Sequence, residues 1–211
     1  MYPVRLYQQA TQTESHLFNG PQYVDYRRQM REGHQFFLQD AAATGNVHYD
    51  GASYDQVPML YDLVKDEVII MRNNLLMQKL VSEKVASFEL NGHRFVRHVA
   101  PQSADSSSLP TGFYDVLHDG TSKMLVKRQK QMEEKVEDKF LIEIYSHRDK
   151  FFLGKEKTFY QVRSKKSVYQ LLKDKKKELK KYARSNKLRF RKQREEGILA
   201  LITYYDTLRN Q

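Results

Sequence analysis

The sequence contains no cysteine, no tryptophan, and only five prolines and nine glycines among its 211 residues. The lack of thiols excludes disulfides, thiolate metal sites and cysteine nucleophiles, but it says little about the compartment. No apolar run approaches the roughly 18 residues that a membrane-spanning helix needs. The composition therefore predicts a soluble chain that is long enough to bury a hydrophobic core.

The motifs of common catalytic sites are also missing. The sequence has no Gly-x-Ser-x-Gly elbow, no Gly-x-Gly-x-x-Gly, no phosphate-binding loop and no His-Glu-x-x-His. No two of the seven histidines are two residues apart, the spacing that places two imidazoles on one strand face. The sequence thus predicts no catalytic residue, no metal site and no cofactor. The enzyme alternative is a hydrolase using a carboxylate pair from Asp50, Asp55, Asp62, Asp66 and Glu67, of which Asp50 and Asp66 read as turn residues.

Antiparallel strands are indicated by turn signals that alternate with short runs of Val, Ile, Tyr and Phe. Three dipeptides, Asp50-Gly51, Asn91-Gly92 and Asp119-Gly120, are typical of hairpin turns, and each glycine is expected in a left-handed conformation. About ten strands of ordinary length then fit between residues 46 and 162. Residues 100–110, rich in Ser and Pro, are expected to form a mobile loop, whereas residues 129–138 fit either a strand or a helical turn.

After Val162 the apolar period changes from two to 3.6 residues. One helical face carries Val168, Leu171, Leu172, Leu179, Tyr182 and Ala183, with Ser164 as its predicted N-cap and Asn186 as its end. A second stripe runs through Ile198, Leu201, Ile202, Tyr205 and Leu208. The predicted fold is mainly β (α+β): a loose arm over 1–21, an antiparallel β-meander over 22–162 forming a curved sheet or open barrel, and a basic helical pair over 163–211 packed on it.

Positive charge is concentrated in the second half of the chain. Residues 1–110 hold 10 Lys and Arg against 12 Asp and Glu, a net charge of −2, whereas residues 111–211 hold 26 against 14, a net of +12. Such asymmetry suggests an anionic partner. The candidate anion-binding residues lie on the polar side of the first helix: Lys173, Lys176, Lys177, Lys180, Lys181 and Arg184. This cluster fits nucleic-acid binding, contact with an anionic membrane, or simply a solvated helix face.

Six segments of the sequence are distinctive as a set: residues 18–26 (FNGPQYVDY), 33–37 (GHQFF), 49–51 (YDG), 57–67 (VPMLYDLVKDE), 165–167 (KKS) and 204–206 (YYD). Together they resemble a family of small, uncharacterised exported proteins of Gram-negative bacteria. The resemblance implies a location in the cell envelope, periplasmic or associated with the outer membrane, with a signal peptide upstream of Met1. Without such a peptide the expected location is the cytoplasm. The family brings no known activity and no functional residues.

These observations predict a non-catalytic binding or structural protein of the cell envelope. Its expected partner is an anionic envelope component or an acidic protein surface. The first alternative is a basic protein that binds nucleic acid through residues 164–194, although the chain has no recognisable nucleic-acid module. The hydrolase with scattered acids comes third.

Overall fold

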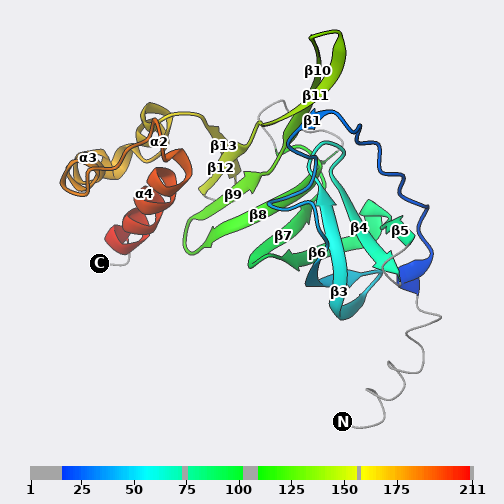
Figure 1. Ribbon diagram of the computed structural model, residues 1–211. Helices are drawn as coiled ribbons and strands as arrows, with labels where there is room; N and C mark the ends of the chain where they lie inside the picture. The colour runs from blue at the N-terminus through cyan, green and yellow to red at the C-terminus, as the bar shows by residue number, and fades with distance from the viewer. Residues whose placement is uncertain (1–15, 73–75, 102–108, 156–157, 210–211) are drawn as a thin grey trace. The chain divides into compact units, whose positions relative to one another are not determined.

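The computed structural model describes residues 16–72, 76–101, 109–155 and 158–209 (Figure 1). Its contacts divide the chain into two compact units, which are described separately. Unit 1 comprises residues 1–92 and 130–146, and unit 2 comprises residues 93–129 and 147–211. The predicted arm, 1–21, falls mostly on residues 1–15, outside the described part, as do residues 102–108 of the predicted loop. The predicted boundary at 162/163 lies inside unit 2, between its last strand and its first helix.

Unit 1 consists of short 3₁₀ turns and of strands that pair antiparallel, except for one short parallel pair over residues 31–32 and 143–144. Its elements are η1 (His16–Phe18), β1 (Arg31–Glu32), β2 (Ala43–Tyr49), β3 (Ala52–Asp62), β4 (Glu67–Arg72), β5 (Leu76–Lys79), η2 (Ser82–Lys84), β6 (Val85–Leu90), β10 (Lys130–Glu137) and β11 (Phe140–His147, whose last residue belongs to unit 2). Five strands pair in the order β6-β2-β3-β4-β5, and a separate small sheet has the order β1-β11-β10. Within the stretch 129–138, for which the sequence allowed two structures, residues 130–137 form β10.

Unit 2 combines a sheet with helices. Its elements are β7 (His93–His98), β8 (Gly112–Asp119), β9 (Lys123–Lys127), β12 (Lys150–Lys155), β13 (Thr158–Val162), α2 (Lys165–Leu171), η3 (Lys173–Lys175), α3 (Lys176–Ser185) and α4 (Arg194–Arg209). The strand order is β13-β12-β9-β8-β7. Apolar residues of β9, β12 and β13 form one core with those of the helices, so the helices of this unit pack on its sheet. None of the described helices is long and apolar enough to cross a membrane.

The mainly β, antiparallel fold class predicted from the sequence is confirmed, with three departures in detail. The meander order is broken in unit 1, where β6 pairs with β2 rather than with β5. Gly51 and Gly92 are left-handed, with φ of 80° and 78°, but Gly120 is not. Gly120 is required for space instead, since a Cβ there would lie 2.5 Å from Oδ2 of Asp206.

The third departure concerns the first predicted helix, expected to run from Ser164 to Asn186. It is broken at Leu172, whose φ of −98° and ψ of 46° are not helical. The side chain of Leu172 is nevertheless buried in the unit 2 core, as is that of Leu179 in the next helix. The chain therefore turns between α2 and α3 while both leucines stay in the same apolar cluster. Among the leucines and isoleucines of the two predicted stripes, Leu171 and Leu208 are half-buried, and the others are buried: Leu172, Leu179, Ile198, Leu201 and Ile202.

Candidate functional site

The basic segment begins at a helix whose first turn is capped by serines. The Ser164 side chain accepts a hydrogen bond from the backbone N–H of Ser167, whose hydroxyl accepts one from the backbone N–H of Ser164. This reciprocal pair is a capping box, which satisfies N–H groups that the first turn leaves unpaired. The predicted N-cap at Ser164 and the predicted end at Asn186, the C-cap of α3, are both confirmed.

The apolar side of α3 is covered within unit 2. Leu179 and Ala183 are buried in a cluster with Ile198, Leu201 and other residues of α4. Tyr182 of α3 stacks on Tyr204 of α4, with ring centroids 4.1 Å apart and planes 9° from parallel. Because its apolar residues are already buried against α4, α3 cannot insert them into a lipid bilayer without separating the two helices.

The opposite side of α3 carries the predicted cations. We call Lys173, Lys176, Lys177, Lys180, Lys181 and Arg184 the basic face; all six side chains are exposed. At about 100° per residue, the five that belong to α3 fall within an arc of about 140°. Glu178, the only acid of α3, falls outside this arc. The link between α3 and α4 adds four further exposed cations, Lys187, Arg189, Arg191 and Lys192, and Arg194 at the start of α4 adds a fifth.

Neighbouring acids do not neutralise the basic face. In the part of the chain that the structure describes, none of its six cations lies in an ion pair with a carboxylate. Asp174, which is next to Lys173 in sequence, instead pairs with Lys155 at 3.1 Å and accepts a hydrogen bond from the Tyr205 hydroxyl at 2.8 Å. Burial tends to raise the pKa of Asp174, but these hydrogen bonds lower it below its ordinary value. The carboxylate is therefore ionised and engaged with α4 and β12.

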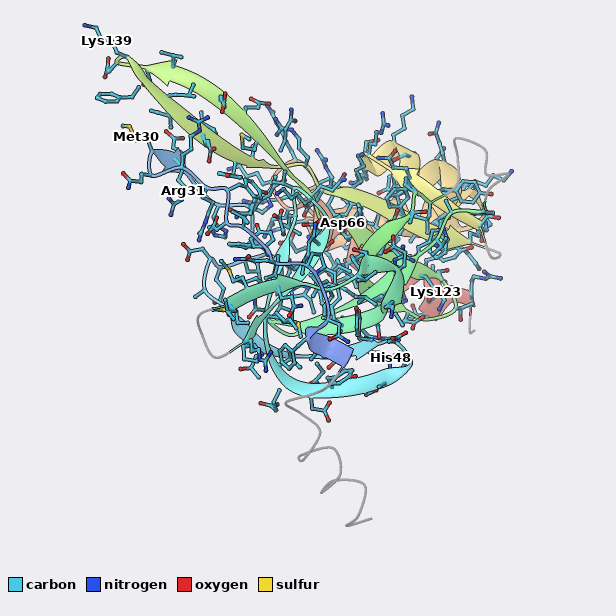
Figure 2. All side chains as sticks on the ribbon, turned by 90° about the vertical axis from the view of Figure 1, so that its right-hand side faces the viewer. Met30, Arg31, His48, Asp66, Lys123 and Lys139 are labelled. Atoms are coloured by element: carbon cyan, nitrogen blue, oxygen red, sulfur yellow. The ribbon has the colours of Figure 1, made fainter. Side chains whose placement is uncertain are left out.

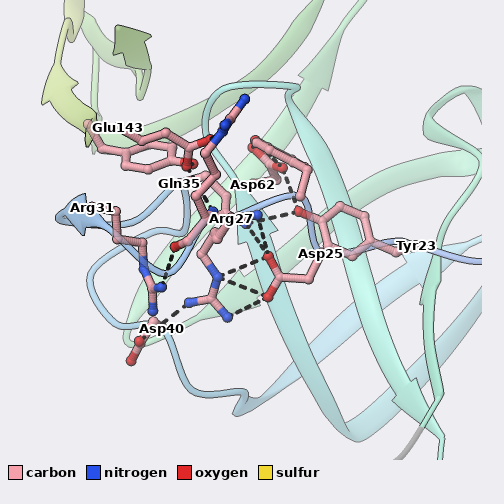
Figure 3. A network of polar contacts seen from close by, with 11 residues as sticks. Tyr23, Asp25, Arg27, Arg31, Gln35, Asp40, Asp62 and Glu143 are labelled. Atoms are coloured by element: carbon pink, nitrogen blue, oxygen red, sulfur yellow. Dashed lines mark hydrogen bonds and ion pairs between the residues drawn. The ribbon is translucent and has the colours of Figure 1, made fainter. Parts of the chain in front are cut away.

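A buried polar cluster that the sequence did not predict lies in unit 1 (Figure 3). Asp62, at the end of β3, is fully buried, and Oδ2 accepts hydrogen bonds from the hydroxyls of Tyr23 and Tyr26 at 2.8 and 2.9 Å. Its other oxygen accepts the backbone N–H groups of Val64 and Lys65. Burial raises the pKa of both tyrosines well above its ordinary value, so both hydroxyls stay protonated as donors. The cluster ties the chain segment before β1 to the end of β3.

A second buried cluster lies in unit 2 around Arg128, which is 8% exposed. Its guanidinium donates to Asp115 at 2.7 and 2.9 Å, to Asp149 at 2.9 Å, and to Glu195 at 2.5 and 2.9 Å. Burial alone would lower the pKa of Arg128, but its hydrogen bond to Glu195 and the charge of Asp115 raise it above its ordinary value. His93 also contacts Asp115, at 2.8 Å. This cluster links β8, β9 and the first turn of α4.

Ser122, His118 and Asp206 also come together in unit 2, but they do not form a catalytic triad. Oδ2 of Asp206 lies 2.9 Å from Nε2 of His118 and accepts the backbone N–H of Ser122 at 3.0 Å. The Ser122 hydroxyl is buried and has no hydrogen-bond partner among the described residues. A triad needs the imidazole between the carboxylate and an accessible hydroxyl. The arrangement instead anchors the end of α4 to the turn between β8 and β9.

The acids considered for a hydrolase have structural contacts. Asp50 pairs with Lys84, and Glu67 pairs with Lys79. Asp66 accepts the Tyr61 hydroxyl at 2.5 Å, and Asp62 is enclosed as described above. Asp55 lies exposed on β3. In the described residues no group of three or more His, Asp or Glu side chains is arranged to hold a metal ion.

Each of the two buried clusters is marked in the sequence by an acidic residue inside an apolar run. Asp62 and Asp115 each interrupt an apolar run, in MLYDLV and FYDVL respectively. A charged residue within such a run is buried only when partners satisfy it, so the interruption itself points to a polar cluster. The partners Tyr23 and Glu195 are far away in sequence and could not have been named.

No protein-family model, no curated protein and no solved structure matches the chain. Function is therefore inferred from the residues and geometry of this chain.

Proposed function

We propose that the protein is a non-catalytic binding protein that attaches to an anionic component of the cell envelope through the basic face. The observation that carries this proposal is that one side of α3 presents exposed cations, whereas the apolar residues of its other side pack against α4. Because α3 is already packed, its backbone needs no further ordering when the cations bind a polyanion.

The packing of the apolar side of α3 against α4 also argues against one binding mode, insertion of the helix into a bilayer. An interfacial amphipathic helix inserts its apolar residues into the acyl boundary, but those of α3 already contact α4. Attachment to a lipid head-group surface would then be electrostatic and peripheral, with about 1 kcal/mol contributed by each cation near the surface. Such binding is reversed by salt, because screening acts on every contributing charge. The resemblance to exported proteins favours an envelope component as the partner.

The experiment is a titration of the full chain with vesicles containing anionic phospholipid, at low and high salt, beside the same titration with duplex DNA. The test variant replaces five residues of the basic face with glutamine: Lys173, Lys176, Lys177, Lys180 and Lys181. A matched control removes the same number of charges from exposed cations elsewhere: Lys84, Arg94, Lys123, Lys139 and Lys150.

We expect salt-sensitive vesicle binding that falls at least about hundredfold in the test variant and much less in the control. Failure of the chain to bind anionic vesicles at low salt would contradict the proposal, as would equal losses in both variants. Tight DNA binding with a log–log salt slope of about −5, abolished in the test variant alone, would favour the nucleic-acid alternative instead.

A further inference from the structure

The hairpin formed by β10 and β11 extends beyond the other strands of unit 1 (Figure 1), with Lys139 at its tip (Figure 2). Its turn residues, Asp138 and Lys139, have φ of 48° and 70°, which is typical of a two-residue hairpin loop. In the three-stranded sheet β1-β11-β10, β10 is an end strand. Val136, near the tip, is 70% exposed. The hairpin thus presents a strand edge with an exposed apolar side chain.

The position of the turn determines which residues of β10 point their backbone N–H and C=O groups toward the free edge. In a two-residue hairpin, the residues that flank the turn exchange hydrogen bonds, and alternate residues then point their N–H and C=O groups away from the partner strand. Counting back from Glu137, the outward residues are Val136, Glu134, Met132 and Lys130. The N–H of Lys130 does point outward, since it donates to the carbonyl of Leu63 at 3.2 Å. Within the described part of the chain, the outward backbone groups of Met132, Glu134 and Val136 have no strand or turn partner, so they are available to an additional strand.

We infer that two copies of the chain associate through this edge, with β10 of one copy antiparallel to β10 of the other and a twofold axis at Glu134. This register pairs Met132 with Val136 of the second copy and Glu134 with its own equivalent. It uses every outward residue that remains and forms about six backbone hydrogen bonds, two per pair. The exposed Val136 then gains an apolar neighbour in Met132 of the second copy.

The side chains favour the same register. Glu133 of one copy lies opposite Lys135 of the other, and the twofold axis repeats this attractive pair. Moving the axis by one residue would place Glu133 or Lys135 opposite its own equivalent and would leave one outward residue unpaired. At the axis itself, each Glu134 carboxylate has its own cation, because Arg28 lies 3.2 Å away. A contact of this size is smaller than the interfaces of permanent dimers, so the dimer should dissociate on dilution.

The first test measures molecular mass by sedimentation over a dilution series of the full chain. Glu134→Pro removes an outward N–H, which an edge strand tolerates, together with the exposed ion pair between Glu134 and Arg28, and should leave the chain folded but monomeric. Glu133→Lys and Lys135→Glu each replace two attractive cross-strand pairs by repulsive ones, and the dissociation constant should rise about tenfold or more. The double variant restores the pairs and should dimerise within about threefold of the original chain. Lys139→Glu, in the turn outside the paired segment, is the matched control.

The second test reports the register. Because the chain has no cysteine, a single Glu134→Cys substitution places two thiols opposite each other across the axis, at a Cα separation of about 5.5 Å that suits a disulfide. Mild oxidation should give a covalent dimer with this variant and not with Glu133→Cys. A chain that is monomeric at every concentration would overturn the inference. A dimer unaffected by Glu134→Pro and by both charge reversals would overturn it as well.

Discussion

The two units differ sharply in charge. Unit 1 carries 11 Lys and Arg against 16 Asp and Glu, a net charge of −5, whereas unit 2 carries 25 against 10, a net of +15. This separation is larger than that between the two halves of the sequence, −2 and +12, because the acidic hairpin at 130–146 belongs to unit 1. Charge therefore follows the fold more closely than it follows sequence position.

The units also satisfy their buried charges in opposite ways. Unit 1 buries a carboxylate, Asp62, and surrounds it with neutral hydroxyl and backbone donors. Unit 2 buries a guanidinium, Arg128, and surrounds it with carboxylates. Further acids of unit 2, Asp174 and Asp206, are likewise engaged in contacts within the unit. These acids of unit 2 are thus engaged within the unit, and among the described residues none forms an ion pair with a cation of the basic face.

The largest expected effect is on the buried centre of unit 1. Asp62→Ala leaves two tyrosine hydroxyls and two backbone N–H groups without their acceptor, and should reduce the free energy of unfolding by about 3–5 kcal/mol. The measurement is urea unfolding followed by tyrosine fluorescence, which no tryptophan obscures. Asp40→Ala, an exposed partner of Arg27, is the control and should cost less than about 0.5 kcal/mol. A loss below about 1 kcal/mol for Asp62→Ala would show that these donors find other acceptors.

A smaller loss of unfolding free energy is expected from a substitution in the apolar core of unit 2. Leu201 of α4 is completely buried, and Leu201→Ala should cost about 2–4 kcal/mol by leaving a cavity. Helical circular dichroism reports on unit 2, because all described α-helices lie there. Thr203→Ala, exposed on the same helix, should change stability by no more than about 0.5 kcal/mol. If Leu201→Ala changed stability as little as Thr203→Ala, the apolar stripe of α4 would not be buried in the core of unit 2.

Sequence reasoning succeeded where local chemistry decides the structure. Asp50-Gly51 and Asn91-Gly92 adopt the expected turn conformations because an Asx-Gly pair accepts positive φ at least cost. The cap at Ser164 depends only on residues within one helical turn. The exposure of the basic face also followed from a helical period that places Leu179 and Lys180 on different sides.

Sequence reasoning failed where the local structure depends on residues that are far apart in the sequence. Gly120 was explained by a turn rule, although its need for space comes from Asp206, far along the chain. The break at Leu172 has no glycine or proline to announce it, and on both sides of it the chain packs into the core shared with α4. The division into units could not be read either, because β12 pairs with β9 across the excursion of the β10–β11 hairpin.

The smallest expected effect is a pH dependence confined to unit 2. Burial raises the pKa of Asp206, but the contact with His118 and the hydrogen bond from Ser122 lower it more, so its folded pKa lies below its ordinary value. A carboxyl with a lowered folded pKa stabilises the protein above its unfolded pKa of about 3.9, and this contribution is lost as the pH falls through the folded value. Asp206→Asn should therefore be less stable than the original chain by about 1 kcal/mol at pH 7.

The two stabilities should converge as the pH falls below about 4, because protonation then removes the same interaction from the original chain. Urea unfolding at several pH values between neutral and acid, read by helical circular dichroism, measures this difference directly. Glu196→Gln, an exposed acid in the first turn of the same helix, is the matched control and should follow the original chain at every pH. A constant gap between Asp206→Asn and the original chain across the whole range would mean that shape rather than charge anchors the end of α4. The link between this acid and the turn at Gly120 would then be steric alone.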